Sequence, residues 1–345
     1  AVAVMQLVEQ GLVDLDAPAS SYAPGYDVPD EVTVRSLLNQ TSGFGYDESL
    51  ADAQVGDTFG TFSYANANYD LLGRVVEGAS GEDYARYLDE HVLEPLGMAS
   101  TTADPARAEA LGMVPGHRDW FGLPVADGFR HAQGDGAWGG PASGYVASSV
   151  RDMASYLRMY LNGGMGGDGA RVLSADSVRR MFLDRVPDPE GDTYYGMGWT
   201  SFSWDDGELV LSHDGQVENY TASMCLLPER GIGIVALSDA NDNAGGNIRF
   251  FDLVGGVVSV AIGGTGQPMD DAWTWAWRQR VDVLYASALL LAVSPLLLTG
   301  RWRRRLSAAC RGGVAPIVRA RSLRMLLVRS VLLHVALPAC ILALP

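Results

Sequence analysis

The chain has 345 residues, of which 48% are hydrophobic, 9% aromatic and 19% charged, a composition that excludes a disordered or collagen-like chain. Its length suffices for one large domain or two smaller ones, each with its own core. All 25 basic residues are Arg and they are unevenly spread: residues 1–270 carry 14 Arg and 39 acids, a net charge of −25, whereas residues 271–345 carry 11 Arg and 2 acids, a net charge of +9. Because an acidic front part repels polynucleotides, we expect no nucleic-acid partner.

The front part begins with helical patterns. Apolar spacing and capping residues predict helices over residues 1–11, 33–38, 69–77, 84–91, 152–161 and 174–183. Gly11 is expected to end the first helix and Thr33 to cap the second. Ser80 with Asp83 is expected to form a capping box before the fourth.

From Tyr195 onward the apolar period changes from helical to alternating. The alternation predicts strands over residues 196–204, 208–213, 220–227 and 233–238, and a helix over residues 247–262 that closes the sheet. Helices followed by an antiparallel meander predict an α+β domain. Residues 112–145 are rich in Gly and Pro without a clear period, which favours a loop that lines a substrate site.

The basic tail combines apolar runs with Arg. Val283–Leu298 contains no charge and, with its flanks, reaches roughly the 17–20 residues that a membrane-spanning helix needs. Nine Arg follow before a second apolar run, Ser330–Pro345. This arrangement matches the positive-inside rule, with a buried core helix of a soluble protein as the alternative.

The tail therefore predicts an organisation in the cell membrane. We expect a juxtamembrane linker (266–280), a transmembrane helix (281–299), an Arg-rich cytoplasmic loop (300–324) and a second transmembrane helix (325–345). With that loop in the cytoplasm, the acidic domain, residues 1–265, would lie on the extracytoplasmic side.

Six segments of the front part carry the strongest functional signal. They are AVMQLVEQGLVDLDAP (3–18), LLNQTSGFG (37–45), FSYANANYDLLGRVVE (62–77), LEPLGM (93–98), YGMGW (195–199) and HDGQVENYTASMCLLPERGIGIVALSDAND (213–242). Together and in this order they closely resemble the serine β-lactamase-like family, which includes class C β-lactamases, D-alanyl-D-alanine carboxypeptidases and related esterases of the penicillin-binding-protein fold. The resemblance implies an α+β fold with an antiparallel sheet flanked by helices and a helical subdomain.

The same resemblance implies the chemistry. The family transfers acyl groups through a Ser–x–x–Lys nucleophile, a Tyr–x–Asn element and a Lys-Thr-Gly or His-x-Gly strand. By resemblance, Tyr64 and Asn66 match the second element and His213 the third. A Tyr phenol can act as a base where nearby positive charge lowers its pKa, and an Asn carboxamide can orient a substrate amide.

The strand element implies an oxyanion site. Gly215 is expected to let the strand backbone approach the substrate, so that the amide of Gln216 points at the developing oxyanion. His213 in place of Lys weakens the positive charge beside Tyr64, because His is mostly neutral above about pH 6.5. Substrates with an obligatory carboxylate are therefore disfavoured, whereas esters and D-amino-acid peptides remain candidate substrates.

The first element of the family is absent from these residues. The sequence contains no Lys, so no Ser–x–x–Lys is present, and no G-x-S-x-G elbow replaces it. We expect the nucleophile and its Lys directly upstream of Ala1, in a chain cut at both ends, and expect this fragment itself to be inactive.

These features predict a membrane-anchored serine hydrolase that forms an acyl-enzyme with a small-molecule or peptidoglycan-type substrate and needs no cofactor. The alternatives are a catalytically inactive wall- or ligand-binding module and a sensory ectodomain of the same fold.

Other polar residues have simpler interpretations. Ser42 and Gly43 are expected to form a supporting turn, and Asp135 and Trp138 are candidates for lining the pocket. The histidines His91, His117, His131 and His213 show no ligand spacing, so we expect no metal site, and we interpret His117 and His131 as incidental.

Overall fold

The structure, a computed structural model, describes residues 1–120, 122–126, 128, 130–204, 207–242, 247–266, 279–297, 300, 304, 307 and 328–342. The chain divides into two compact units, one comprising residues 1–118, 126–241 and 249–268, the other comprising residues 119–125, 242–248 and 269–345.

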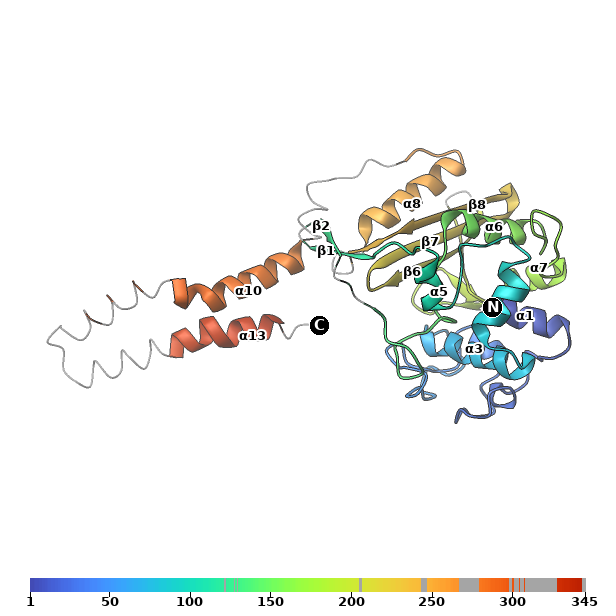
Figure 1. Cartoon of the computed structure of the whole chain (residues 1–345), viewed down its shortest axis with the longest axis horizontal. Helices are drawn as coiled ribbons and strands as arrows, with labels where there is room; N and C mark the ends of the chain where they lie inside the picture. Colours follow the sequence, from blue (N-terminus) through green and yellow to red (C-terminus); the bar gives the residue numbers. More distant parts are fainter. Residues whose placement is uncertain are drawn as a thin grey trace. The chain divides into compact units, whose positions relative to one another are not determined.

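The first unit contains a six-stranded antiparallel sheet whose strands follow chain order (Figure 1). They are β3 (Val186–Pro187), β4 (Tyr194–Gly196), β5 (Trp199–Ser203), β6 (Leu209–Val217), β7 (Tyr220–Leu227) and β8 (Ile232–Ser238). The expected meander is confirmed, with one correction. The strand predicted over residues 196–204 is interrupted at Met197 and Gly198, because Met197 has a φ of 49° and its amide donates to the carbonyl of Leu38 at 3.0 Å.

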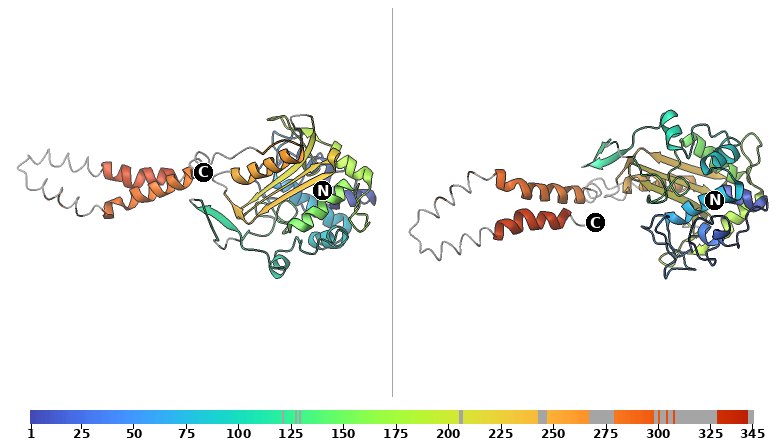
Figure 2. Two further views of the ribbon diagram at one scale, coloured as in Figure 1. Left: turned by 90° about the horizontal axis from the view of Figure 1, so that it is seen from above. Right: turned by 60° about the horizontal axis from the view of Figure 1, so that its bottom comes forward.

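Alternating side chains bury both faces of this sheet. On one face, Val210, Cys225 and Leu227 pack with Val258 of α8 (Ile248–Ala261). On the opposite face lies α6 (Val150–Leu161), and both helices are seen against the sheet in Figures 1 and 2. The predicted helix over residues 247–262 is thus confirmed as a cover of the sheet, and the α+β class is confirmed with it.

The remaining helices of this unit, apart from α5, pack into one apolar core with the α6 face of the sheet. In chain order, the remaining helices are α1 (Val2–Glu9), α2 (Val34–Leu38), α3 (Asn66–Ser80), α4 (Tyr84–Leu88), α5 (Pro105–Ala110) and α7 (Ala175–Leu183). Short turns are η1 (Ala19–Ser21), η2 (Asp89–Leu93, π-helical) and η3 (Pro228–Arg230). Thr33 caps α2 as predicted, whereas Asp83 alone caps α4, because the Ser80 hydroxyl bonds back to the Val76 carbonyl.

The Gly- and Pro-rich region contains little regular structure, as its composition predicts. It holds β1 (His117–Trp120) and β2 (Leu123–Val125). His117 of β1 pairs in parallel with Ala240 of β9 (Ala240–Asn241).

The second unit contains α10 (Arg280–Leu297), η5 (Leu332–Ala336, π-helical) and α13 (Leu337–Leu342). Ser294 of α10 lies 3.0 Å from the Nδ1 atom of His334. Within the described ranges, no helix is both long enough and apolar enough to cross a membrane, so the expected transmembrane helices are not supported. The expected Arg-rich loop, apart from Gly300, Arg304 and Ser307, and most of the linker before α10 lie outside the described residues.

Candidate active site

Tyr64 and Asn66 flank the start of α3. Ala65, in extended conformation, is the N-cap residue of this helix and Asn66 is its first helical residue, so Asn66 does not cap it. The start of the helix is held by the side chain of Gln40. Its Oε1 accepts a hydrogen bond from the Ala65 amide at 3.0 Å and another from the side chain of Asn68. Gln40 is fully buried and has a φ of 58°, a left-handed conformation. A buried side chain that follows α2 therefore fixes where Tyr64 and Asn66 stand.

His213, Gly215 and Gln216 lie on β6, which is longer than the sequence predicts. Pairing with β5 ends at Ser212, opposite Thr200, whereas residues 213–217 pair with β7. The three predicted site residues thus occupy the part of β6 that extends past β5. This part lies next to the turn between β4 and β5.

Three rings from separate elements converge at this place. The Tyr64 ring lies 6.4 Å from the His213 ring and 6.1 Å from the Tyr195 ring, measured between centroids. The Tyr195 hydroxyl lies 3.5 Å from Nε2 of His213. The structure therefore brings Tyr64 and His213 together, as the resemblance implies.

Tyr195 is a functional candidate that no sequence motif singles out. Its ring stacks on Phe62 with centroids 5.3 Å apart, and its hydroxyl lies 3.5 Å from that of Tyr69, which donates to the Leu38 carbonyl at 3.1 Å. The YGMGW segment that contains Tyr195 was part of the family signal, but its spacing alone gave no reason to expect a ring between Tyr64 and His213.

The charge state of this cluster follows from its burial. Burial raises the pKa of Tyr64 to about 12, and Tyr46 and Asp70 add to the shift. Burial lowers the pKa of His213, although Asp214 opposes the change. At neutral pH both groups are uncharged, so among the described residues neither the tyrosines nor His213 supplies the positive charge that would make Tyr64 a base.

Asn66 lies against the segment that precedes α6. A Cβ atom placed on Gly139 would come within 3.2 Å of Nδ2 of Asn66. Gly139 has a φ of +82°, which glycine adopts without strain. Of the two suggested lining residues, Trp138 donates to the Tyr46 carbonyl at 3.0 Å. The Tyr46 ring lies 6.3 Å from the Tyr64 ring, so Tyr46 connects Trp138 to the ring cluster formed by Tyr64, Tyr195 and His213.

Asp135, the other suggested lining residue, attaches the segment before α6 to the helical part of the domain. Its carboxylate accepts from Arg74 and from the Tyr26 hydroxyl, each at 2.6 Å. Ser42 is fully buried and its hydroxyl accepts from the Phe44 amide at 3.1 Å, as expected of a supporting turn.

Gly215 and Gln216 lie in the part of β6 that pairs with β7. A Cβ atom on Gly215 would meet the Cβ of Ala222 at 3.6 Å, an ordinary contact. Gln216, exposed at its side chain, lies opposite Thr221 of β7. Their roles in an oxyanion site stay predictions.

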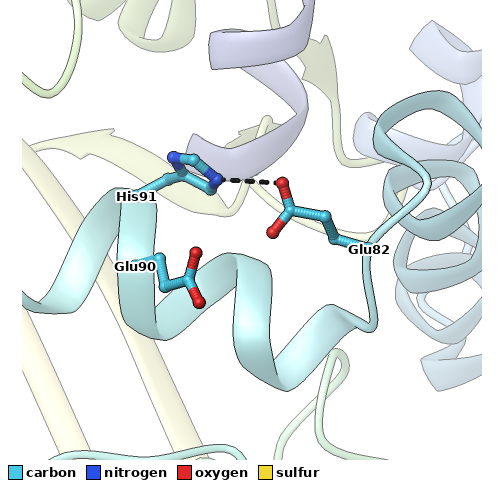
Figure 3. Close-up of side chains that lie close together, drawn as sticks. All are labelled: Glu82, Glu90 and His91. Carbon is cyan, nitrogen blue, oxygen red and sulfur yellow. Dashed lines mark hydrogen bonds and ion pairs between the residues drawn. The ribbon is translucent and has the colours of Figure 1, made fainter.

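One group of side chains has the spacing of metal ligands. Atoms of Glu82, Glu90 and His91 lie within 4.8 Å of one another, and His91 is 3.3 Å from Glu82 (Figure 3). Arg86 pairs with both carboxylates, at 3.1 Å and 3.3 Å. Because this cation already balances the acids, we interpret the group as a surface ion-pair network.

Comparisons with known proteins agree with this architecture. Residues 1–252 match the family model described as Beta-lactamase. The chain is 26% identical over 264 residues to Protein flp of Staphylococcus aureus (strain MW2), which covers 70% of this chain and 50% of flp. It is 28% identical over 267 residues to penicillin-binding protein 4 of Amycolatopsis lactamdurans, covering 68% of each.

Among solved structures, the octameric penicillin-binding protein homologue from Pyrococcus abyssi superimposes with a TM-score of 0.60 and 24% identity, over 77% of this chain and 64% of that one. This likeness concerns the fold. The chain spans about half the length of flp, the curated relative that it matches in several strains.

Proposed function

This chain belongs to the beta-lactamase family, and on that premise we propose that it carries part of the active site of a serine hydrolase that acts through an acyl-enzyme. The observation that carries the proposal is the convergence of Tyr64 and His213 with Tyr195, beside Asn66, at the part of β6 that extends past β5. In this reaction a serine hydroxyl attacks the substrate carbonyl, the leaving group departs with a proton, and water then releases the acyl group.

Tyr64 takes part in the proton transfers of both steps. With its pKa at about 12, it is a neutral phenol in this environment and can donate a proton to a leaving group. To accept a proton from serine it needs a cation nearby, which in the family is the Lys of Ser–x–x–Lys. The 345 residues contain no Lys, and the sequence prediction puts this pair directly upstream of Ala1.

For the substrate, the charges around the site favour neutral or cationic acyl groups over carboxylates. His213 is uncharged at neutral pH, and the charged side chains that act on the two rings are acids, Asp70 on Tyr64 and Asp214 on His213. We propose esters and D-amino-acid peptides as the preferred substrates, with β-lactams, which carry an obligatory carboxylate, as weaker ones.

The proposal is tested by extending the chain. The coding sequence upstream of Ala1 is read, and the longer protein is incubated with a chromogenic ester, a D-alanine anilide and a labelled penicillin. We expect a covalent adduct, seen as a mass increase, on a serine that the extension supplies, and none on the 345 residues alone. Turnover that persists when that serine is replaced by Ala, or an extension that lacks a serine, would overturn the serine-hydrolase proposal.

An adduct that forms but is not released would instead favour the sensory ectodomain. Binding of substrate without any adduct would favour the wall- or ligand-binding module. Intact-protein mass spectrometry reports the adduct, and an equilibrium binding measurement on the same protein reports binding without an adduct.

We also propose that the tail holds the domain at the cell membrane, on the extracytoplasmic side. The support is the sequence pattern of a charge-free run followed by nine Arg and a second apolar run. Cell fractionation and protease treatment test it: recovery in the soluble fraction, or digestion of residues 1–265 only in inside-out vesicles, would rule it out.

A further inference from the structure

A second polar cluster lies beside the ring cluster and takes no part in the proposed chemistry. We call it the His131 clasp: His131, Tyr145 and Glu218. Nδ1 of His131 lies 3.1 Å from Oε1 of Glu218, and the Tyr145 hydroxyl donates to Oε2 of Glu218 at 3.1 Å. The rings of His131 and Tyr145 stack in near-parallel planes with centroids 3.7 Å apart. Through Glu218, the clasp therefore joins both ends of the segment 131–145 to the turn between β6 and β7.

Both ring nitrogens of His131 face hydrogen-bond acceptors. Nδ1 faces the Glu218 carboxylate, and Nε2 lies 2.9 Å from the Gly139 carbonyl. An imidazole can donate through each nitrogen that carries a proton, so His131 can bridge the Glu218 carboxylate and the Gly139 carbonyl. The contact is shielded from solvent, because the side chain of His131 is only 12% exposed.

The contact between His131 and Gly139 links the clasp to the site. Gly139 is buried, and a Cβ on it would lie 3.2 Å from Nδ2 of Asn66 and 3.2 Å from Cε2 of Tyr145. The Gly139 backbone therefore lies close to the Asn66 carboxamide, with too little space between them for a side chain. A displacement of Gly139 would change the surroundings of that carboxamide.

The same segment is anchored independently on its other side. Asp135 is held by Arg74 and Tyr26, and Trp138 by the Tyr46 carbonyl. These contacts attach the segment to the helical part of the domain. Glu218, in contrast, attaches it to the sheet that carries His213.

We propose that Glu218 is a positioning residue of the active site, which through His131 keeps Gly139 against Asn66 and so fixes the carboxamide that orients the substrate. This inference rests on the proposed function for its catalytic consequence, but the clasp itself is a property of the described residues. Within the described part of the chain, Glu218 bonds to His131 and Tyr145 and not to Tyr64 or His213, so its proposed effect runs through Gly139 and Asn66.

The first experiment measures hydrogen exchange in the full 345-residue chain. Glu218→Gln removes the charge that pairs with His131, and we expect the amides of residues 139–145 to lose protection by about tenfold or more. Glu229→Gln, in the exposed turn between β7 and β8 at the opposite end of the sheet, is the matched control and should change nothing. Unchanged protection in E218Q would overturn the clasp, whatever the activity of the protein.

The second experiment is a double-mutant cycle on acylation by the extended, nucleophile-bearing chain. We expect E218Q to lower kcat/KM about tenfold, in line with the cost of a misplaced orienting group, and to have less than about a twofold effect when Asn66 is already replaced in N66A. An equal effect in both backgrounds would show that Glu218 does not act through Asn66. If the exchange result holds but no acylation is found, the clasp stands and the hydrolase proposal fails.

Discussion

The rings of Tyr64 and His213 lie 6.4 Å apart between centroids and are inclined by 48°, although Tyr64 precedes α3 and His213 lies within β6. This distance is within the range at which aromatic rings pack against one another. Tyr195 of β4 packs against each of the two rings as well, at 6.1 Å and 6.2 Å, so the three rings form one cluster.

The first prediction concerns the Tyr64 hydroxyl. In the extended, active chain, Tyr64→Phe should lower kcat by about 100- to 10,000-fold, the usual contribution of a proton-transfer group. The Phe ring keeps the packing with Tyr46 and Tyr195, so the free energy of unfolding should change by less than about 1 kcal/mol. Tyr46→Phe is the control, and an equal loss of activity in both variants would argue against a specific role for Tyr64.

The second prediction concerns the charge of the strand residue. His213→Lys places a cation beside Tyr64, which should lower the pKa of that phenol and attract substrate carboxylates. We expect kcat/KM for a penicillin to rise about tenfold relative to that for an ester, equivalent to about 1.4 kcal/mol. His213→Gln, which adds no charge, should leave the ratio unchanged. A ratio that does not move in H213K would contradict the electrostatic argument for neutral substrates.

The third prediction concerns Asp70 on α3. Burial raises the pKa of Asp70 to about 6, against the opposing effects of the Ser143 hydroxyl and the Gly140 amide. An acid whose pKa is raised on folding binds its proton more tightly in the folded state, so its contribution to stability falls as the pH rises from about 4 through about 6. The loss is complete above that range and amounts to at most about 3 kcal/mol.

Asp70→Asn removes this titration. We expect D70N to be more stable than the parent chain at pH 8 and closer to it at pH 4, as measured by urea unfolding at both values. Comparing the two chains cancels the opposite effects of acids such as Asp135, whose pKa is lowered by Tyr26 and Arg74 despite burial. A difference that grows as the pH falls would show that the carboxylate stabilises the fold.

The sequence predicts the antiparallel sheet and the helix α8 that packs on it, because side chains that alternate in the sequence also alternate between the two faces of each strand. The break at Met197 is not predicted, because the apolar pattern continues across it. The strand turns there because the Met197 amide donates to the Leu38 carbonyl. A contact between residues so far apart in the chain leaves no local signal.

Site residues divide in the same way. Tyr64 and His213 are found because their motifs are local, whereas His131 is interpreted as incidental because its partner, Glu218, lies far along the chain. Gln40 belongs to a recognised segment, yet nothing in that segment shows that its side chain reaches the start of α3. Pairings that only the fold creates are the part that sequence patterns miss.

The last prediction concerns Gln40, the buried residue beneath Tyr64 and Asn66. Gln40→Ala removes the acceptor for the Ala65 amide and the Asn68 side chain and leaves both donors buried. The lost hydrogen bonds and the cavity together should cost about 2–4 kcal/mol of unfolding free energy. Gln54→Ala, at an exposed position in the same part of the chain, is the control and should cost less than about 0.5 kcal/mol.

The effect of Gln40→Ala should also be local. Because Gln40 holds the first turn of α3, hydrogen exchange at the amides of residues 65–68 should accelerate more than exchange in the second half of the helix. Tyr64 and Asn66 then lose their fixed positions, so activity in the extended chain should fall further than stability alone explains. Uniform exchange along α3 would mean that Gln40 contributes only packing and that the site is held by the ring cluster instead.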